Sequence, residues 1–261
     1  YFFIFYMKQV LLAFICALAF LPVTNAQEDD LLSLLGEEET TDYANAAFKT
    51  NRVINLHSLE NTAAGVFDFK ISHRFGFISG GVQELFGLDA STIRIGGDYG
   101  ITNRLMVGFG RSSYEKTYDV FGKYKLLRQS SGKKNMPITA AVFASAAIKT
   151  IPFSDPERDN YFSSRLYYTW QLILGRKFSE GFSLQVSPTL VHRNLTATVA
   201  EKNDVYAVAG AGRIKLSKRV ALNAEYIYVL PDQIASRYRN SLSLGFDIET
   251  GGHVFQLHFT N

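Results

Sequence analysis

The chain has 261 residues, of which 47% are hydrophobic and 14% aromatic, and its formal net charge is +3. Beyond the N-terminal apolar run, no stretch approaches the roughly eighteen apolar residues that a transmembrane helix needs. This composition argues against a helical membrane protein and is compatible with a transmembrane β-barrel, whose strands alternate apolar and polar residues.

The N-terminus has the organisation of a secretory signal peptide. Met7 is followed by a lysine, an apolar run over residues 10–23, and small residues that end at Ala26. This order predicts cleavage after Ala26, so residues 1–26 comprise upstream residues and a signal peptide. Cys16, the one cysteine, lies in the apolar run, so the mature chain has no disulfides and no thiol chemistry.

The segment that follows, residues 27–61, is acidic. Residues 27–60 contain eight acidic and two basic residues, whereas residues 61–261 contain 16 acidic and 24 basic residues. Leucines followed by acidic residues and threonines predict a short N-terminal helical segment. We expect residues 31–48 to plug the periplasmic opening of a basic barrel through their acidic side chains, Glu37, Glu38, Glu39 and Asp42. The alternative is a solvated periplasmic tail that docks a partner or has no role.

From residue 65 onward the sequence alternates with the period of two that β-strands show. The hairpin of residues 166–190 is the clearest case, because Trp170 and Leu172 share one parity and Gln171 the other. Residues 52–60 do not hold one parity, so their assignment as a strand stays open. We predict eleven strands: one from residue 65 to about 75, then 93–101, 105–111, 118–127, 138–148, the two limbs of the hairpin, 205–216, 220–230, 242–248 and 254–259.

The connections between these strands alternate between short turns and long loops, with two departures at residues 112–117 and 129–137. This alternation is typical of an outer-membrane barrel with periplasmic turns and external loops. The sequence therefore predicts an all-β, antiparallel, up-and-down transmembrane barrel over residues 62–261. Because bacterial barrels have even strand numbers, we expect about twelve strands, with the last one beyond Asn261. The rival is that residues 52–60 supply the twelfth.

Long phrases of the sequence carry a resemblance to a known family, among them LLSLLGEEETTDYANAAFKTNRVINLHSLE and LFGLDASTIRIGGDYGITNRLMVGFGRSS. The chain resembles the uncharacterised outer-membrane β-barrel proteins of Bacteroidetes, which are Gram-negative bacteria, over almost the whole mature chain. The resemblance implies a domain of unknown function in the cell outer membrane and one further strand after Asn261. It implies no activity, ligand or catalytic residue.

Charged residues occupy the parity opposite the apolar one, as expected for a barrel lumen, because a charge facing lipid costs about 2 to 4 kcal/mol at the midplane. Two functions follow. One is a porin-like channel for small solutes, with a basic lumen that favours anions. The other is a structural or docking barrel with a filled lumen, which binds a partner through its loops or periplasmic segment. The candidate basic lumen residues are Lys70, Arg74, Arg94, Lys123, Lys125, Arg165, Arg213 and Lys215.

Motifs of enzymatic chemistry are missing from the sequence, which contains no HExxH, GxSxG or phosphate-binding loop. The one candidate catalytic set is His192 near a strand end together with Ser187 or Ser163. We prefer to interpret His192 as a non-catalytic histidine at the rim of the barrel. We expect no enzyme, no metal, no cofactor and no nucleic acid. The expected partners are outer-membrane lipids, the barrel assembly machinery during insertion and a periplasmic protein.

Overall fold

A computed structural model describes residues 40–153, 155–199 and 201–261. The predicted signal peptide with its cleavage site at Ala26, and the acidic residues Glu37, Glu38 and Glu39, lie outside these described residues.

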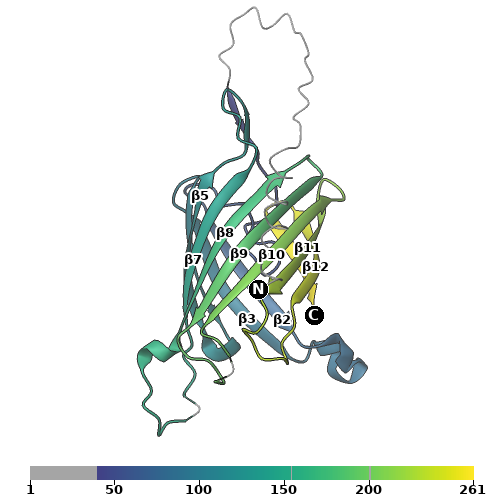
Figure 1. Cartoon of the computed structure of the whole chain (residues 1–261). Coiled ribbons are helices and arrows are strands. Elements are labelled where there is room, and N and C mark those ends of the chain that lie inside the picture. Colours follow the sequence, from purple (N-terminus) through teal and green to yellow (C-terminus); the bar gives the residue numbers. More distant parts are fainter. Residues whose placement is uncertain (1–39, 154, 200) are drawn as a thin grey trace, which may run out of the picture.

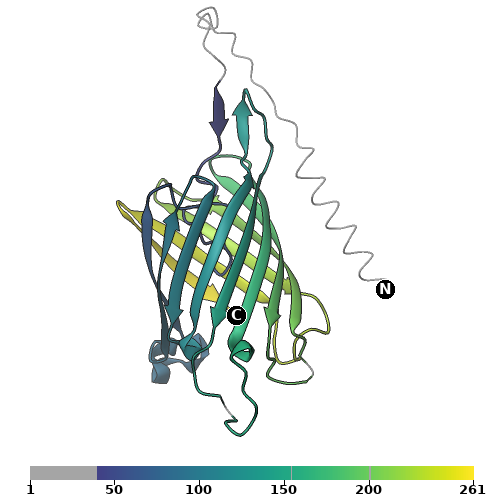
Figure 2. The same ribbon diagram turned by 90° about the vertical axis from the view of Figure 1, so that its left-hand side faces the viewer.

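Eleven long strands form one antiparallel up-and-down sheet that curls into a barrel (Figures 1 and 2). Each strand pairs with the next long strand along the chain, which is the meander that alternating turns and loops predict. The strands are β2 (Phe67–Phe75), β3 (Ser91–Gly100), β4 (Leu105–Ser112), β5 (Tyr118–Leu127), β7 (Thr139–Ile148), β8 (Leu166–Lys177), β9 (Phe182–Arg193), β10 (Asp204–Lys215), β11 (Val220–Val229), β12 (Ser241–Thr250) and β13 (His253–Thr260).

The connections divide the barrel into two ends. Short turns join strands at one end, with the extension between β5 and β7 as the exception, and the longer loops lie at the other. The loops carry 3₁₀ turns at η2 (Ile78–Gly80), η3 (Val82–Gly87), η4 (Tyr114–Lys116) and η5 (Phe162–Arg165). We refer below to the short-turn end and the long-loop end.

The predicted all-β fold and its eleven strands are confirmed, but the sheet is not closed. Its edges are β2 and β13. Since the sheet is antiparallel throughout and has an odd number of strands, β2 and β13 run in the same direction. The rival possibility, that residues 52–60 supply a strand of the barrel, is wrong: their single bridge, Arg52 to His57, lies outside the sheet.

The two faces of the sheet have inverted polarity compared with a soluble barrel. On β8, the side chains of Trp170 and Leu172 are exposed on the outside, whereas Gln171 and Ile173 are buried inside. Apolar side chains with similar exposure cover the outer face of β2, β12 and β13. An outer surface of this kind is stable against hydrocarbon and unfavourable in water. In the described part of the chain, no helix is long and apolar enough to span a membrane.

Pro188 lies in the middle of β9, and a proline within a strand favours a bulge or an early end of the strand. The β8–β9 ladder pairs Gln171 with Thr189 and Leu174 with Val186, so the register is the same on both sides of the proline. The two positions between them are unpaired in this ladder. A proline lacks the N–H donor, and the strand accommodates this loss as a local gap without a bulge.

Residues 40–48 do not form the predicted helix. Thr41–Tyr43 form β1, which pairs with β6 (Ser130–Gly132) in a two-stranded sheet that extends beyond the short-turn end (Figure 1). Thr40 adds a backbone contact, since its carbonyl accepts a hydrogen bond from the Lys133 amide at 3.1 Å. Pairing with β6 supplies the backbone partners that a short isolated helix would lack, because few helices of this length are stable alone.

Neighbouring positions on β7 test the assignment of faces. Ala144 is exposed on the outer face and Ser145 faces inward. Lysine at 144 places a charge in lipid, so Ala144→Lys should lower the free energy of unfolding in lipid vesicles by about 2 to 4 kcal/mol. Ser145→Lys is the matched control and should lower it less in denaturant titrations. An equal or larger loss for Ser145→Lys would contradict the assignment.

Candidate functional site

Residues 44–62, here called the plug, enter the lumen from the short-turn end and leave it at the same end. At entry, the Ala44 amide donates to the Gln129 carbonyl at 2.9 Å. After the exit, the chain lies against the end of β3, where the Gly65 amide donates to the Gly100 carbonyl at 2.8 Å. A Cβ on Gly100 would lie only 2.0 Å from the Ala63 carbonyl oxygen, so this close approach requires glycine.

The tip of the plug is a tight turn that is held by one carboxylate of the barrel wall. The backbone amides of Ile54, Asn55 and Leu56 donate to the carboxylate of Glu225 on β11, at 3.0–3.2 Å. Glu225 is 1% exposed. Three successive amides around a buried anion satisfy a charge that would otherwise be strongly destabilising.

Two basic side chains of the wall hold carbonyl groups of the plug. Lys123 on β5 is 1% exposed, and its Nζ donates to the carbonyl oxygens of Ser58, at 3.0 Å, and of Glu60. Arg213 on β10 donates through Nη1 to the carbonyls of Ala46 and Ala47, at 2.9 and 3.1 Å. The wall thus binds main-chain atoms of the plug with charge-assisted hydrogen bonds, which are stronger than neutral ones.

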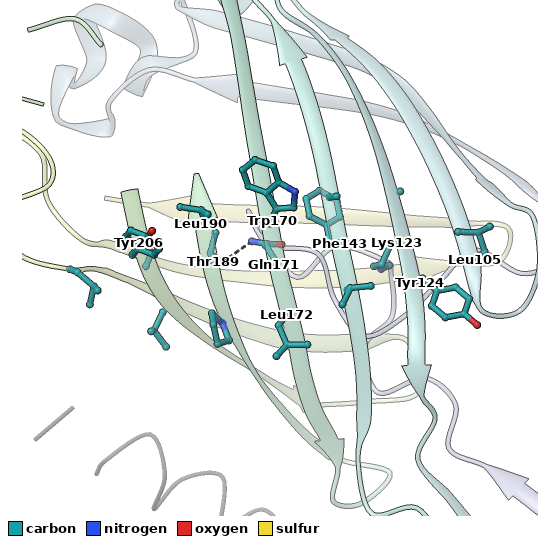
Figure 3. A pocket seen from close by; sticks show the side chains of 17 residues that line it. Leu105, Lys123, Tyr124, Phe143, Trp170, Gln171, Leu172, Thr189, Leu190 and Tyr206 are labelled. Carbon is teal, nitrogen blue, oxygen red and sulfur yellow. Dashed lines mark hydrogen bonds between the residues drawn. The ribbon is translucent and has the colours of Figure 1, made fainter. Parts of the chain in front are cut away.

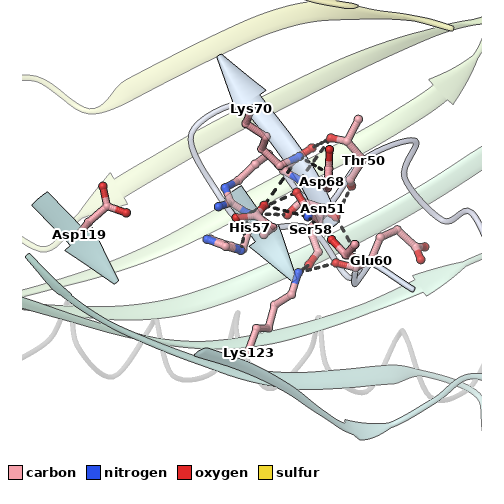
Figure 4. A network of polar contacts seen from close by, with 12 residues as sticks. Thr50, Asn51, His57, Ser58, Glu60, Asp68, Lys70, Asp119 and Lys123 are labelled. Atoms are coloured by element: carbon pink, nitrogen blue, oxygen red, sulfur yellow. Dashed lines mark hydrogen bonds and ion pairs between the residues drawn. The ribbon is translucent and has the colours of Figure 1, made fainter. Parts of the chain in front are cut away.

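A polar network joins the plug to the wall (Figure 4), and its contacts include β3 and β9. Asn51 Nδ2 donates to Asp98 Oδ2 at 3.0 Å, and Arg52 Nη1 lies 3.5 Å from the same oxygen. Arg52 also donates to His57 Nδ1 at 2.9 Å. The His57 carbonyl accepts a hydrogen bond from Gln185 Nε2 at 2.9 Å, so the network spans the plug between opposite parts of the wall.

The other side of the plug is apolar and forms a core within the barrel. Phe48 and Leu59 are among its buried apolar side chains, and they belong to one cluster with wall residues. The His57 ring lies 4.7 Å from the Phe121 ring and 4.1 Å from the Phe143 ring, measured between centroids. Inward apolar side chains of the wall are therefore covered by the plug, which removes them from water. The cluster comprises Ala47, Phe48, Val53, Ile54, Leu56, Leu59, Met106, Phe121, Ala141, Phe143, Ile173, Ala209 and Ala211.

The plug also contacts both edges of the open sheet. On β2, Arg74 Nη2 donates to Asn55 Oδ1 at 2.7 Å. On β13, Gln256 Nε2 donates to Thr50 Oγ1 at 3.2 Å. The two strands that do not pair with each other are therefore connected from inside through the plug.

A turn at the short-turn end adds a further tether. Lys177 Nζ donates to the Asn45 carbonyl at 2.9 Å and to the carboxylate of Glu180 in the turn after β8. The hydrogen bond from Lys177 lowers the pKa of Glu180. Glu180 thus stays ionised beside the lysine that holds the beginning of the plug.

The structure places most of the predicted basic lumen residues inside, and most of these side chains form hydrogen bonds or ion pairs within the protein. Arg74, Lys123 and Arg213 bind the plug as described, and Lys125 lies 3.8 Å from Glu60 of the plug. The remaining predicted residues have other surroundings. Lys70 pairs with Asp68 at 2.7 Å, and Arg94 donates through Nε to Asp119 at 2.9 Å. Lys215 lies at the short-turn end of β10. Arg165 lies in η5, where it donates to the loop carbonyls of Lys149 and Ile151.

The plug inside the lumen is not the acidic segment that the sequence predicts. Of its predicted acidic residues, only Asp42 is described, and it lies in β1 opposite Ser131, outside the lumen. The lumen is occupied instead by residues 44–62, whose charged side chains are Lys49, Arg52 and Glu60. Lys49 pairs with Glu249 of the wall. The Asp42 carboxylate remains hydrated outside the lumen, whereas burial inside would impose a desolvation cost.

The catalytic set considered from the sequence does not assemble. Ser187 and His192 lie at positions of opposite parity on β9, so they face opposite sides of the wall. His192 Nδ1 lies 2.7 Å from Asp204 Oδ1 at the long-loop end. Ser163 contributes its carbonyl to a hydrogen bond from Asn194. Across the described ranges, no group of three or more His, Cys, Asp or Glu residues is placed to hold a metal ion.

A hollow of about 730 Å³ lies in the outer wall near the gap at Pro188 (Figure 3). Tyr124, Trp170, Leu172 and Tyr206 are among its lining residues, and most of the lining is apolar. Gln171 also borders the hollow, but its side chain faces inward and donates to Thr189 Oγ1 at 3.2 Å. Because the hollow opens on the outer apolar face, it belongs to the lipid-facing surface and not to the lumen.

Comparison with known proteins places this architecture in a family. Residues 48–261 match the model of a membrane-bound β-barrel domain of unknown function. The chain belongs to this family. The match begins at Phe48, within the plug, so the family domain includes most of the plug together with the barrel. No curated protein and no solved structure matched the chain.

Removal of the tip carboxylate tests how the plug is held. Glu225→Ala leaves the amides of residues 54–56 without their acceptor, so we expect their hydrogen exchange to accelerate by about tenfold or more. Asp119→Ala, a control that removes an inward carboxylate paired with Arg94, should leave exchange at these amides unchanged. Unchanged exchange in Glu225→Ala would show that the carboxylate does not hold the tip.

Proposed function

We propose that this membrane barrel is closed in its resting state by its own plug and acts mainly as a filled-lumen docking barrel. The observation that carries this proposal is the occupation of the lumen by residues 44–62, which contact the inward side chains of most strands. A freely open, anion-selective channel is less well supported, because Lys123 and Arg213 already bind plug carbonyls.

The docking element is the segment that precedes the plug. It leaves the lumen at the short-turn end, where β1 and β6 extend the barrel as a small sheet. A partner that binds this segment acts directly on the plug, because the two are consecutive in the chain. In the proposed outer-membrane location, with turns on the periplasmic side, this partner is a periplasmic protein.

Passage of small solutes is the second candidate, and it requires withdrawal of the plug. The polar contacts of the plug support it, because they can be exchanged for hydrogen bonds to water. Glu225 accepts hydrogen bonds from plug amides, and Lys123 and Arg213 donate hydrogen bonds to plug carbonyls. The lumen left behind would be lined by charges of both signs. Small ions and polar solutes are the class that such a lining fits.

The outer-membrane location is part of the proposal, together with lipids as the surrounding partner and the barrel assembly machinery for insertion. The signal-peptide pattern and the division between short turns and long loops support it. We further propose that the barrel is not an enzyme and requires no cofactor.

Conductance in planar bilayers tests the closed state. We expect the wild-type protein to be silent, and the double variant Glu225→Ala/Lys123→Ala to show conducting events because the plug loses its anchors at the tip and at the exit. Arg94→Ala/Asp119→Ala removes one inward base and one inward acid that pair with each other, and this matched control should stay silent.

Steady conductance of the wild-type protein at low voltage would overturn the closed resting state. If the plug is released in the double variant, as shown by exchange at residues 54–56, but conductance stays absent, solute passage is rejected and docking remains.

A further inference from the structure

The loop between β2 and β3, residues 76–90, presents an unusual concentration of apolar side chains to the outside. Phe77 is 80% exposed and Val82 is 79% exposed. The loop contains two acidic residues, Glu84 and Asp89, and no basic residue. Its exposed apolar side chains are Phe77, Ile78, Val82, Leu85, Phe86 and Leu88.

The fold of the loop holds these side chains outward. Its neck is closed by a hydrogen bond from the Gly76 amide to the Gly87 carbonyl, at 2.8 Å. Gly87 has φ +86°, and a Cβ there would lie 2.5 Å from Gly76 backbone atoms, so the neck requires glycine. Leu85 and Phe86 have φ of 45° and 54°, a region that residues with a side chain rarely adopt. An Ω-like loop usually packs its own side chains inside, whereas here the strained backbone exposes them.

The apolar surface of the loop continues the lipid-facing surface of the barrel. On β2, Phe69, Ile71 and Phe75 point outward and are exposed. Phe77 follows Phe75 at the same parity, so the outward row, which is apolar on β2 apart from His73, continues from the strand into the loop. In Figure 1 the loop projects sideways beyond the wall near β2 and does not cover the lumen.

We propose that residues 77–88 insert into the bilayer leaflet on the long-loop side and contact lipid acyl chains as a lateral anchor of the barrel. The nine residues of β2 span about 30 Å along the strand, and a tilt of about 45° reduces this to roughly 21 Å of height. Phe75 therefore lies near the boundary of an apolar band about 25 Å tall. With no basic residue in the loop, attraction to the membrane is apolar and not electrostatic.

A single-cysteine experiment with the full chain in lipid vesicles tests this proposal. In a Cys16→Ser background, Val82→Cys is labelled with an environment-sensitive dye and quenched either by spin-labelled lipid or by aqueous iodide. Val199→Cys is the matched control, because Val199 is a fully exposed valine in the β9–β10 loop at the same end of the barrel. Phe77→Cys gives a second position in the same loop if Val82→Cys fails to fold.

We expect the spin-labelled lipid to quench the dye at position 82 several-fold more than at position 199, with iodide showing the reverse order. Quenching by iodide alone at position 82 would overturn the proposal, because the loop would then lie in water. Protection from both quenchers would overturn it as well, because another protein or a second copy would then cover the loop.

Discussion

The structure depends on finding partners for the charged and polar side chains inside a barrel whose outer face is apolar. Membrane strands whose residues alternate between apolar and polar place their charged and amide side chains in the lumen. The apolar outer face of the wall offers these side chains few hydrogen-bonding partners. Glu225, Lys123 and Arg213 find these partners in the main chain of residues 44–62. A main-chain segment is well suited to this role, because its amides satisfy an inward acid and its carbonyls satisfy inward bases.

The same segment also compensates for the two open edges of the sheet. With eleven antiparallel strands, β2 and β13 point the same way and do not pair. Contacts from Arg74 and Gln256 connect both strands to the plug. The plug is therefore part of the packing of the barrel as well as an obstacle to passage, and this dual role favours a filled lumen over an empty pore.

The strands and their faces could be predicted from the sequence because the two environments impose a local rule. Trp170 and Leu172 alternate with Gln171, and such a pattern needs only neighbouring residues to be recognised. The effect of Pro188 is harder to predict, because it depends on which of the two neighbouring strand ladders loses a hydrogen bond. The 41–43 strand and its partner at 130–132 are short, and their pairing joins segments almost ninety residues apart.

For a related reason, the plug residues cannot be predicted from neighbouring residues in the sequence alone. The charge distribution predicts a plug at residues 31–48, whereas the described lumen holds residues 44–62, because burial favours main-chain groups and a few paired side chains. One signal was present in the sequence. Phe121, Phe143 and Ile173 are large apolar residues on the inward parity, and such side chains require an apolar partner inside the barrel. The irregular apolar residues of 53–59 are that partner.

Direct cross-linking of the plug tip to the wall in membranes tests the central claim. Asn55 Nδ2 donates to Ser243 Oγ at 3.0 Å, so Asn55→Cys/Ser243→Cys in a Cys16→Ser background should be joined rapidly by a short bifunctional thiol reagent. Asn55→Cys/Ser131→Cys, whose second site lies in the sheet outside the lumen, should not be joined. Absence of the first cross-link in folded protein with both thiols reactive would contradict a plug inside the barrel.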